Sequence, residues 1–197
     1  ACAPYRRLHL CHHNLEKIAT STTSDTLLLE VCLAAHYEGE SLKKYHAQYD
    51  AEHHDTGSTI CTVLARSFAD IGDIVRGRDI FRGNDEEKKK RDDLKKNLKT
   101  IFGKIKGNNN STLTGLPLHK VREYWWEANR ETVWKALTCK ADDSNRYFRA
   151  TCSDTKGESV ASHKCRCKDE NLTKETDQVP TYFDYVPQYL RWFEEWA

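Results

Sequence analysis

The stretch DEEKKKRDDLKKNLKTIFGKIKG, residues 85–107, decides the fold class. Its apolar side chains recur at helical spacing and fall on one stripe: Leu94, Leu98, Ile101, Phe102 and Ile105. Acidic residues begin the stretch and two lysines lie near its end, an arrangement that suits the dipole of a helix. The stretch therefore predicts an amphipathic helix whose stripe packs against a core.

Helical patterns also lie on both sides of this stretch. Residues 24–49 and 60–75 precede it, and Gly39 weakens the middle of the first pattern. Residues 118–137 follow it and carry three tryptophans in a broad apolar band, which indicates burial on more than one side. Pro187 is suited to begin a fifth helix, because its missing N–H costs nothing there. No stretch alternates for long enough to build a sheet, so we expect an all-α bundle.

Composition excludes several classes of protein. The chain has 197 residues and a formal net charge of +1, which gives no reason to expect nucleic acid as a partner. No apolar run is long enough for a membrane span, and no signal pattern opens the chain. Because the chain begins at Ala1-Cys2 and ends within an aromatic run at Trp196-Ala197, we expect it to be a segment of a longer protein.

Eight cysteines are predicted to form structural disulfides: Cys2, Cys11, Cys32, Cys61, Cys139, Cys152, Cys165 and Cys167. Their spacing matches no C-x-x-C pair, which argues against a zinc ribbon. A metal site built from Cys11-His12-His13, or from His163, Cys165 and Cys167, would have ligand spacings unlike those of known zinc sites. Disulfides in an oxidising, extracellular setting are favoured. We expect them to tie the long polar loop region 139–178 to the helices, with no metal or cofactor.

No catalytic motif is present in the sequence. It contains no G-x-S-x-G, Walker loop, H-E-x-x-H or G-x-G-x-x-G pattern, and its histidines are scattered or paired in polar segments. Nothing in the sequence supports a Cys–His nucleophile pair. We therefore expect a protein that is not an enzyme.

One local charge asymmetry stands out within residues 85–107. Its cationic members are Lys88, Lys89, Lys90, Arg91, Lys95, Lys96 and Lys99. The favoured interpretation is the solvated face of a helix, since Asp92 and Asp93 are interleaved with these residues. The functional alternative is a site for sulfated glycans or another polyanion, where clustered Lys and Arg gain charge-assisted contacts.

Five blocks of the chain, in this order, resemble the Duffy-binding-like domains of malaria parasites. They are CAPYRRLHLC (2–11), LARSFADIGDIVRGRDIF (64–81), REYWWEANRETVWKALTC (122–139), CRCKD (165–169) and VPTYFDYVPQYLRWFEEWA (179–197). The blocks are most similar to the alpha class found in Plasmodium falciparum erythrocyte membrane protein one. The resemblance covers nearly the whole chain.

The resemblance implies a helical fold of three subdomains, of which this chain holds mainly the second. Residues 1–14 would end the first subdomain, residues 15–177 would form the helical bundle of the second, and residues 178–197 would begin the third. The aromatic C-terminal run would then pack against the bundle and against a subdomain that lies outside this chain.

The resemblance also implies a function. Members of this family are adhesins, and their alpha class is linked to rosetting through heparan-sulfate-like glycans, blood-group sugars or complement receptor one. We expect a host-cell adhesin on the extracellular face of the infected erythrocyte, recognised by antibodies and anchored by parts of the parent protein outside this chain. The alternative is a module that binds sulfated glycans mainly through the Lys- and Arg-rich helix.

The same resemblance implies part of the disulfide pattern. It pairs Cys61 with Cys165 or Cys167, and it pairs Cys2 and Cys11 with cysteines upstream of Ala1. Cys165 and Cys167 are too close in sequence to bond comfortably with each other, so each is expected to pair elsewhere. The partners of Cys32, Cys139 and Cys152 stay open.

Overall fold

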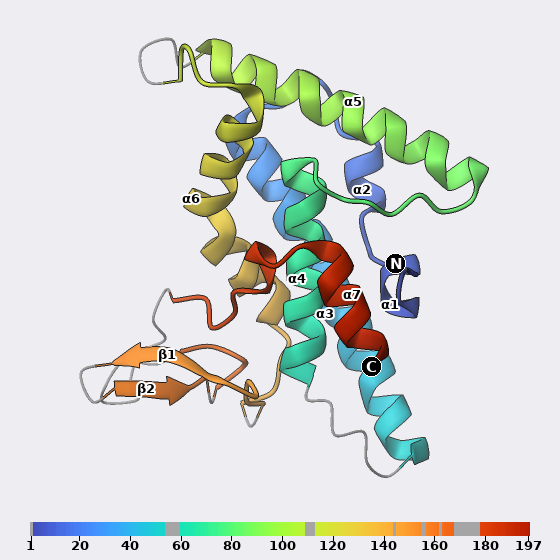
Figure 1. The fold of residues 1–197 in the computed structure, drawn as a ribbon, viewed down its shortest axis with the longest axis vertical. Coiled ribbons are helices and arrows are strands. Elements are labelled where there is room, and N and C mark those ends of the chain that lie inside the picture. Colours follow the sequence, from blue (N-terminus) through green and yellow to red (C-terminus); the bar gives the residue numbers. More distant parts are fainter. Residues whose placement is uncertain are drawn as a thin grey trace.

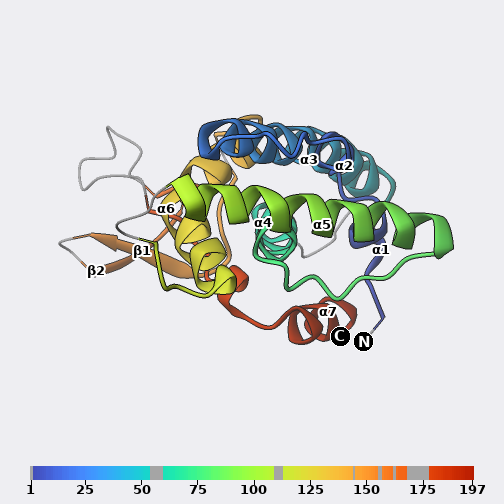
Figure 2. The same ribbon diagram turned by 90° about the horizontal axis from the view of Figure 1, so that it is seen from above.

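Three helices packed side by side, with a fourth across one end, form the bulk of the protein (Figures 1 and 2). This computed structural model describes residues 2–53, 60–108, 113–143, 145–154, 157–161, 163–167 and 178–197. Its long helices are α3 (Ser24–His53), α4 (Ile60–Arg76), α5 (Asp85–Asn108) and α6 (Leu118–Thr138). Helices α3, α4 and α6 contact one another, and α5 crosses their upper end in Figure 1. The predicted all-α bundle is confirmed.

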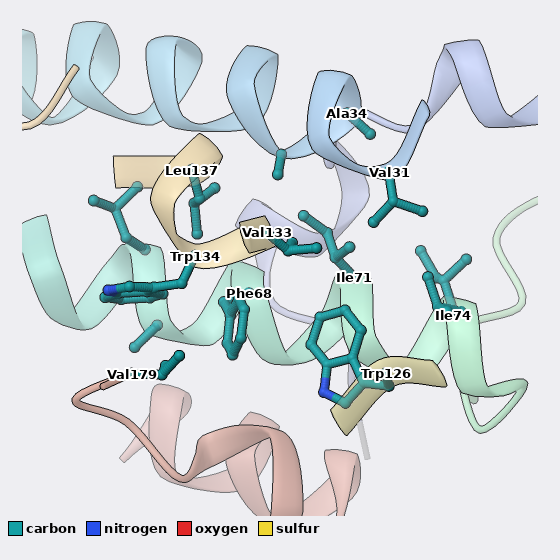
Figure 3. Packing of buried hydrophobic residues seen from close by; sticks show 14 of the residues in the cluster. Val31, Ala34, Phe68, Ile71, Ile74, Trp126, Val133, Trp134, Leu137 and Val179 are labelled. Carbon is teal, nitrogen blue, oxygen red and sulfur yellow. The ribbon is translucent and has the colours of Figure 1, made fainter. Parts of the chain in front are cut away.

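Helix α4 is the central element. Every residue from Ser67 to Arg76 is buried, so this part of the helix is covered on all sides. Figure 3 shows Phe68 of α4 between two indoles of α6, with ring centroids 5.1 Å from Trp126 and 5.2 Å from Trp134. The aromatic band of α6 therefore fills the interface with α4, as large side chains in a close-packed core do.

The contact between α3 and α6 depends on Gly39. A Cβ atom at this position would lie 2.0 Å from the carbonyl oxygen of Leu137. A glycine that lowers the propensity of α3 for the helical state thus permits a close approach of two backbones.

We predicted that the chain forms no sheet, and this prediction is wrong for one segment. Strands β1 (Ala150–Asp154) and β2 (Gly157–Val160) form an antiparallel hairpin, with an irregular register between Ala150 and Cys152. Strands of four or five residues give no alternation that can be recognised in the sequence. The hairpin is fixed by the Cys152–Cys167 disulfide and by a hydrogen bond from Tyr147 N to Ala161 O of 2.9 Å.

The two ends of the chain lie side by side (Figures 1 and 2). The first end carries the short helices α1 (Tyr5–Leu8) and α2 (His13–Glu16), and the last carries η1 (Phe183–Tyr185) and α7 (Gln188–Trp196). Pro187 immediately precedes α7, and Trp196 Nε1 donates a hydrogen bond of 3.1 Å to Cys2 O. Both α1 and α7 contact α4.

One disulfide connects the loop region after α6 to α4, and a second lies within that region. Cys61 on α4 bonds Cys165, which is one of the two partners implied by the resemblance. The second bond joins Cys152 to Cys167. The four other cysteines carry unbonded thiols in the part of the chain described: Cys2, Cys11, Cys32 and Cys139.

Four of the eight cysteines form disulfides within the described residues, and bridges of the other four stay a prediction. The Cys139 sulfur faces the His36 ring instead of another sulfur, and Cys32 lies partly exposed on α3. Pairing of Cys2 and Cys11 with upstream cysteines stays a prediction, as does the division of the chain at residues 14 and 177.

Candidate functional site

The cationic run lies on α5. All six of its lysines are exposed: Lys88, Lys89, Lys90, Lys95, Lys96 and Lys99. Two of them have acidic neighbours one turn away, with Lys90 Nζ 3.6 Å from Glu86 Oε1 and Lys96 Nζ 3.8 Å from Asp93 Oδ1. Exposed pairs of this kind contribute little to stability, so these side chains remain available to an external anion.

Arg91 differs from its six neighbours. Its Nη1 donates a hydrogen bond of 2.9 Å to Asp79 Oδ2, and its guanidinium carbon lies 4.0 Å from the centroid of the Phe81 ring. Arg91 is partly buried by these contacts. The prediction that grouped it with the solvated lysines overlooked a structural role, because its partners lie on another segment of the chain.

A groove of about 500 Å³ separates α5 from the segment that follows α4. Lys88, Arg91 and Lys95 line its α5 side, and Asp79 to Arg82 line the opposite side. The remaining groove residues are His12, Ile74, Gly77, Asp92, Leu94 and Leu98. Three of the seven predicted cationic residues therefore line the groove. The other four lie outside its lining: Lys89, Lys90, Lys96 and Lys99.

A second guanidinium lies behind the groove. Arg7 Nη2 donates a hydrogen bond of 2.6 Å to Asp79 Oδ2, the same oxygen that accepts from Arg91. The guanidinium carbon of Arg7 lies 4.7 Å from the centroid of Phe81. Arg7 has no exposed surface, and its Nε and Nη1 atoms have no hydrogen-bond partner among the described residues. One carboxylate oxygen thus accepts hydrogen bonds from two cations, of which Arg7 is buried and Arg91 is partly buried.

This excess of positive charge shifts the titration of nearby groups. Burial, together with the charge of Arg7, lowers the pKa of Arg91 to about 10. Burial also lowers the pKa of His12 from its ordinary value, and the charges of Arg7 and Arg91 act in the same direction. His12 is therefore neutral at pH 7, and the fixed positive charge of the groove comes from Arg and Lys side chains.

A buried ionic cluster supports this surface from below. Asp70 Oδ2 accepts a hydrogen bond of 2.8 Å from Arg6, and Asp70 Oδ1 accepts one of 2.8 Å from Arg191. Asp73 on the next turn accepts from Arg191 at 2.6 Å and from Arg76 at 3.1 Å. The two aspartates of the DIGDI sequence thus hold the first and last segments of the chain against α4.

Gln188 joins the cluster to the wall of the groove. Its Nε2 donates to Asp70 Oδ1 at 3.0 Å and to Asp79 Oδ1 at 2.8 Å, while its Oε1 accepts from the backbone N–H of Ile80 at 2.8 Å. The segment that carries Asp79, Ile80 and Phe81 is therefore positioned by α7. Sequence periodicity gives no signal for such a contact, because the partners are more than one hundred residues apart.

Helix α7 buries only one of its faces. Trp192 and Arg191 are buried, whereas the opposite face exposes 54% of Tyr189, 74% of Phe193 and 61% of Trp196. Leu190 is also among the exposed large apolar residues. The aromatic C-terminal run therefore packs on α4 with one side and presents a continuous apolar surface with the other.

The described residues offer no metal-binding cluster and one contact between a cysteine and a histidine. No three or more His, Cys, Asp or Glu residues in the described part of the chain form a group that could hold a metal ion. Cys165 and Cys167 are consumed by disulfides, so the metal site considered for them is overturned. One Cys–His contact occurs at the surface, where His36 Nδ1 lies 3.0 Å from Cys139 Sγ.

Among the helices described, none has the combination of length and apolar character that crossing a membrane requires.

Comparison with known proteins links this geometry to a family. The sequence profile described as "Duffy binding domain" matches residues 1–191. The NTS-DBL1α1 domain of Plasmodium falciparum membrane protein 1 (PfEMP1) from the varO strain is a similar solved structure. It is 42% identical, with a TM-score of 0.75, and the match covers 100% of this chain and 43% of the other.

Two further relatives show the range of the similarity. The ICAM-1-binding PfEMP1 DBLβ domain is 32% identical with a TM-score of 0.65, over 97% of this chain and 41% of its own. The Duffy receptor gamma form of Plasmodium knowlesi is 25% identical over 206 residues, which cover 100% of this chain and 15% of the receptor. The chain thus spans less than half the length of each of these relatives.

Proposed function

Because the chain belongs to the Duffy binding domain family, we propose that it is an adhesion domain that binds receptors or glycans on host cells. The observation that carries this proposal is the match over residues 1–191, together with the fold shared with a PfEMP1 domain. The DBLβ relative is described as ICAM-1-binding, and the Plasmodium knowlesi relative as a Duffy receptor. Neither name assigns a ligand to this chain.

The proposed location is the extracellular face of the infected erythrocyte, with membrane anchoring through other parts of the parent protein. The two disulfides support an extracellular setting, since such bonds persist in oxidising compartments. The proposed partners are heparan-sulfate-like glycans, blood-group sugars or complement receptor one in rosetting, and host antibodies.

The proposed mechanism divides the chain into a scaffold and a contact surface. Buried ion pairs at Asp70 and Asp73 and the Cys61–Cys165 bond hold the helices and both ends in one arrangement. A rigid scaffold lowers the entropy cost when exposed side chains bind a receptor. The surface beside α5 is available for such contacts, because its lysines are exposed.

The proposed domain organisation places residues 1–14 at the end of one subdomain, residues 15–177 in the helical bundle and residues 178–197 at the start of the next subdomain. The exposed aromatic face of α7 supports the last assignment, because a large apolar surface is suited to burial by further protein. The boundary at residue 177 itself lies outside the described residues.

A binding survey tests the main proposal. Labelled chain is applied to an array of host receptors and glycans, in physiological salt and in about 0.5 M salt. We expect saturable binding to at least one host component by the folded chain and none by the reduced, denatured chain. If no component on the array is bound, or if the denatured chain binds equally well, the proposal is wrong.

A second candidate function is a sulfated-glycan module that acts through α5. It is favoured by the six exposed lysines of the cationic run, which lie along a single helix. Retention on immobilised heparin tests it, with Lys89, Lys90, Lys96 and Lys99 replaced by Gln. A charge-matched control replaces four exposed lysines outside α5: Lys17, Lys44, Lys120 and Lys140. Arg91 is kept in both variants, because its contacts with Asp79 and Phe81 are structural.

The α5 variant is expected to elute at clearly lower salt than the control variant, since each lost phosphate- or sulfate-like contact reduces the salt dependence. If the two variants elute at the same salt concentration, the lysines of α5 form only a solvated surface and no glycan site.

A further inference from the structure

The groove beside α5 has two kinds of surface. Its apolar side chains are Ile74, Ile80, Phe81, Leu94 and Leu98. Four cationic side chains also line it, namely Arg82, Lys88, Arg91 and Lys95, against only two carboxylates, Asp79 and Asp92. A volume of about 500 Å³ lies within the usual range of ligand pockets, which is about 300–1,000 Å³.

Two guanidinium groups beside the groove share one hydrogen-bonded carboxylate, and the more distant charges of Asp70 and Glu87 also act on Arg7 and Arg91 respectively. Arg7 and Arg91 both donate to Asp79 Oδ2, at 2.6 Å and 2.9 Å, and Arg7 retains two buried donor atoms without acceptors in the described part of the chain. Buried donors without partners are costly, and two cations that share one hydrogen-bonded carboxylate attract a further counter-charge. An anionic group in the groove would lie near Arg91 and above Arg7, and would supply that charge.

We propose that this groove binds an acidic peptide segment of a partner protein, with an apolar side chain on the floor and carboxylates at the cationic rim. The proposal rests on the adhesion function proposed above, and it identifies one contact surface and the kind of partner that fits it. Arg82 and Lys88 are exposed at the rim, where carboxylates can approach them in charge-assisted contacts.

The apolar lining favours a peptide over a sulfated polymer. A polysulfate has no apolar group to cover Ile80, which is 48% exposed, and the exposed lysines outside the groove could bind it equally well. A peptide supplies both an apolar anchor and negative charges, as protein interfaces with a buried apolar centre and a polar rim do.

Two fluorescein-labelled peptides probe the groove by fluorescence polarisation in about 0.15 M salt. The first, Glu-Glu-Leu-Phe-Glu-Glu, has an apolar centre, and the second, Glu-Glu-Ser-Gly-Glu-Glu, has the same charge without it. We expect the first to bind about tenfold more tightly than the second, because only the first fills the floor. Equal affinities, or no measurable binding of the first peptide, would overturn the proposal.

Variants locate the binding. The double substitution Arg82→Ala, Lys88→Ala is expected to lower the affinity for the first peptide about tenfold or more. The control Lys104→Ala, Lys120→Ala removes the same charge from exposed positions away from the groove and is expected to leave affinity unchanged. Ile80→Ser changes a floor residue that is 48% exposed, so the fold is retained, and it is expected to abolish the preference between the two peptides.

The outcomes separate this proposal from the adhesion function. Equal losses in the Arg82/Lys88 variant and its control would show general attraction by positive charge and would overturn the groove as a site. Complete competition by heparin, with both peptides bound alike, would assign the surface to polyanions instead. Host-cell binding by the same variants is measured separately. If the chain binds host cells but not the peptides, only the proposal of a peptide site in the groove is rejected.

Discussion

Asp70 illustrates how single residues hold this fold together. Its carboxylate is completely buried and accepts hydrogen bonds from Arg6, Arg191 and Gln188. Burial alone would raise its pKa, but the charges of Arg6 and Arg191 outweigh burial and lower the pKa below its ordinary value. Asp70 is therefore ionised in the folded protein, and its pairs connect both ends of the chain to α4.

Asp70→Asn is expected to lower the free energy of unfolding by about 3–5 kcal/mol at neutral pH, because it leaves buried guanidinium groups without their counter-charge. The folded-state pKa is depressed, so the stabilisation is present above the unfolded-state pKa of about 3.9 and is lost as pH falls through the lower folded value. Denaturant unfolding of both proteins between pH 3 and pH 7 measures the difference, which should shrink in acid.

Asp93→Asn provides the control for this prediction. Asp93 is exposed and pairs only with Lys96 at 3.8 Å, so its replacement should change stability by less than about 0.5 kcal/mol at any pH. A difference between Asp70→Asn and the native chain that stays constant from pH 7 to pH 3 would show that the Asp70 pairs do not carry the stability assigned to them.

Two glycines test the packing of whole helices. Gly39→Ala is expected to destabilise the chain by about 1–3 kcal/mol, because its Cβ would lie 2.0 Å from the Leu137 carbonyl oxygen and α3 and α6 must separate. Gly103 on α5 has nothing within 4 Å of the equivalent position, so Gly103→Ala should stabilise by about 0.5–1 kcal/mol. Thermal unfolding of both variants measures this. If both substitutions change the stability in the same direction, the close approach of α3 and α6 is refuted.

Helix α5 provides a second test at the scale of elements. Leu98→Ala and Phe102→Ala remove side chains that are buried, so each should cost about 2–5 kcal/mol. Lys96 has 77% of its side chain exposed, and Lys96→Ala should cost less than about 0.5 kcal/mol. Similar shifts in the melting temperature for all three would mean that the stripe of α5 does not face the core.

The long helices were predictable because each carries its own signal. The apolar stripe of α5 and the indoles of α6 repeat at helical spacing, and both helices occur close to the predicted bounds. The β1–β2 hairpin and the short helices near the ends give no such repeat, since four or five residues are too few for a period to appear. Their positions are set by a disulfide and by contacts of α1 with α4 and of α2 with α3 and α5.

The candidate site was predictable only in part. Clustered lysines on one helix are visible in the sequence, and they are exposed as expected. The groove is not visible, because its other wall comes from residues 79–82 and its buried cation from Arg7. Arg91 resembles the neighbouring lysines in sequence, and only the fold brings Asp79 and Phe81 to it.

At the scale of the whole molecule, the two disulfides close loops of different length. Cys61 and Cys165 are 104 residues apart, whereas Cys152 and Cys167 are 15 apart. In the chain-entropy description, replacing the first pair by Ala should destabilise the protein by roughly 1.7 kcal/mol more than replacing the second pair. Denaturant unfolding of the two double variants compares them. An equal loss, or a larger loss for the Cys152 and Cys167 variant, would contradict the long-range role of Cys61–Cys165.

The central claim is that this scaffold presents an adhesive surface to host cells. Its most direct test is flow cytometry of host erythrocytes incubated with increasing concentrations of the labelled, disulfide-intact chain. We expect saturable binding that unlabelled chain displaces and that reduction and denaturation of the chain abolish. Binding that does not saturate, or that the reduced and denatured chain reproduces, would contradict it.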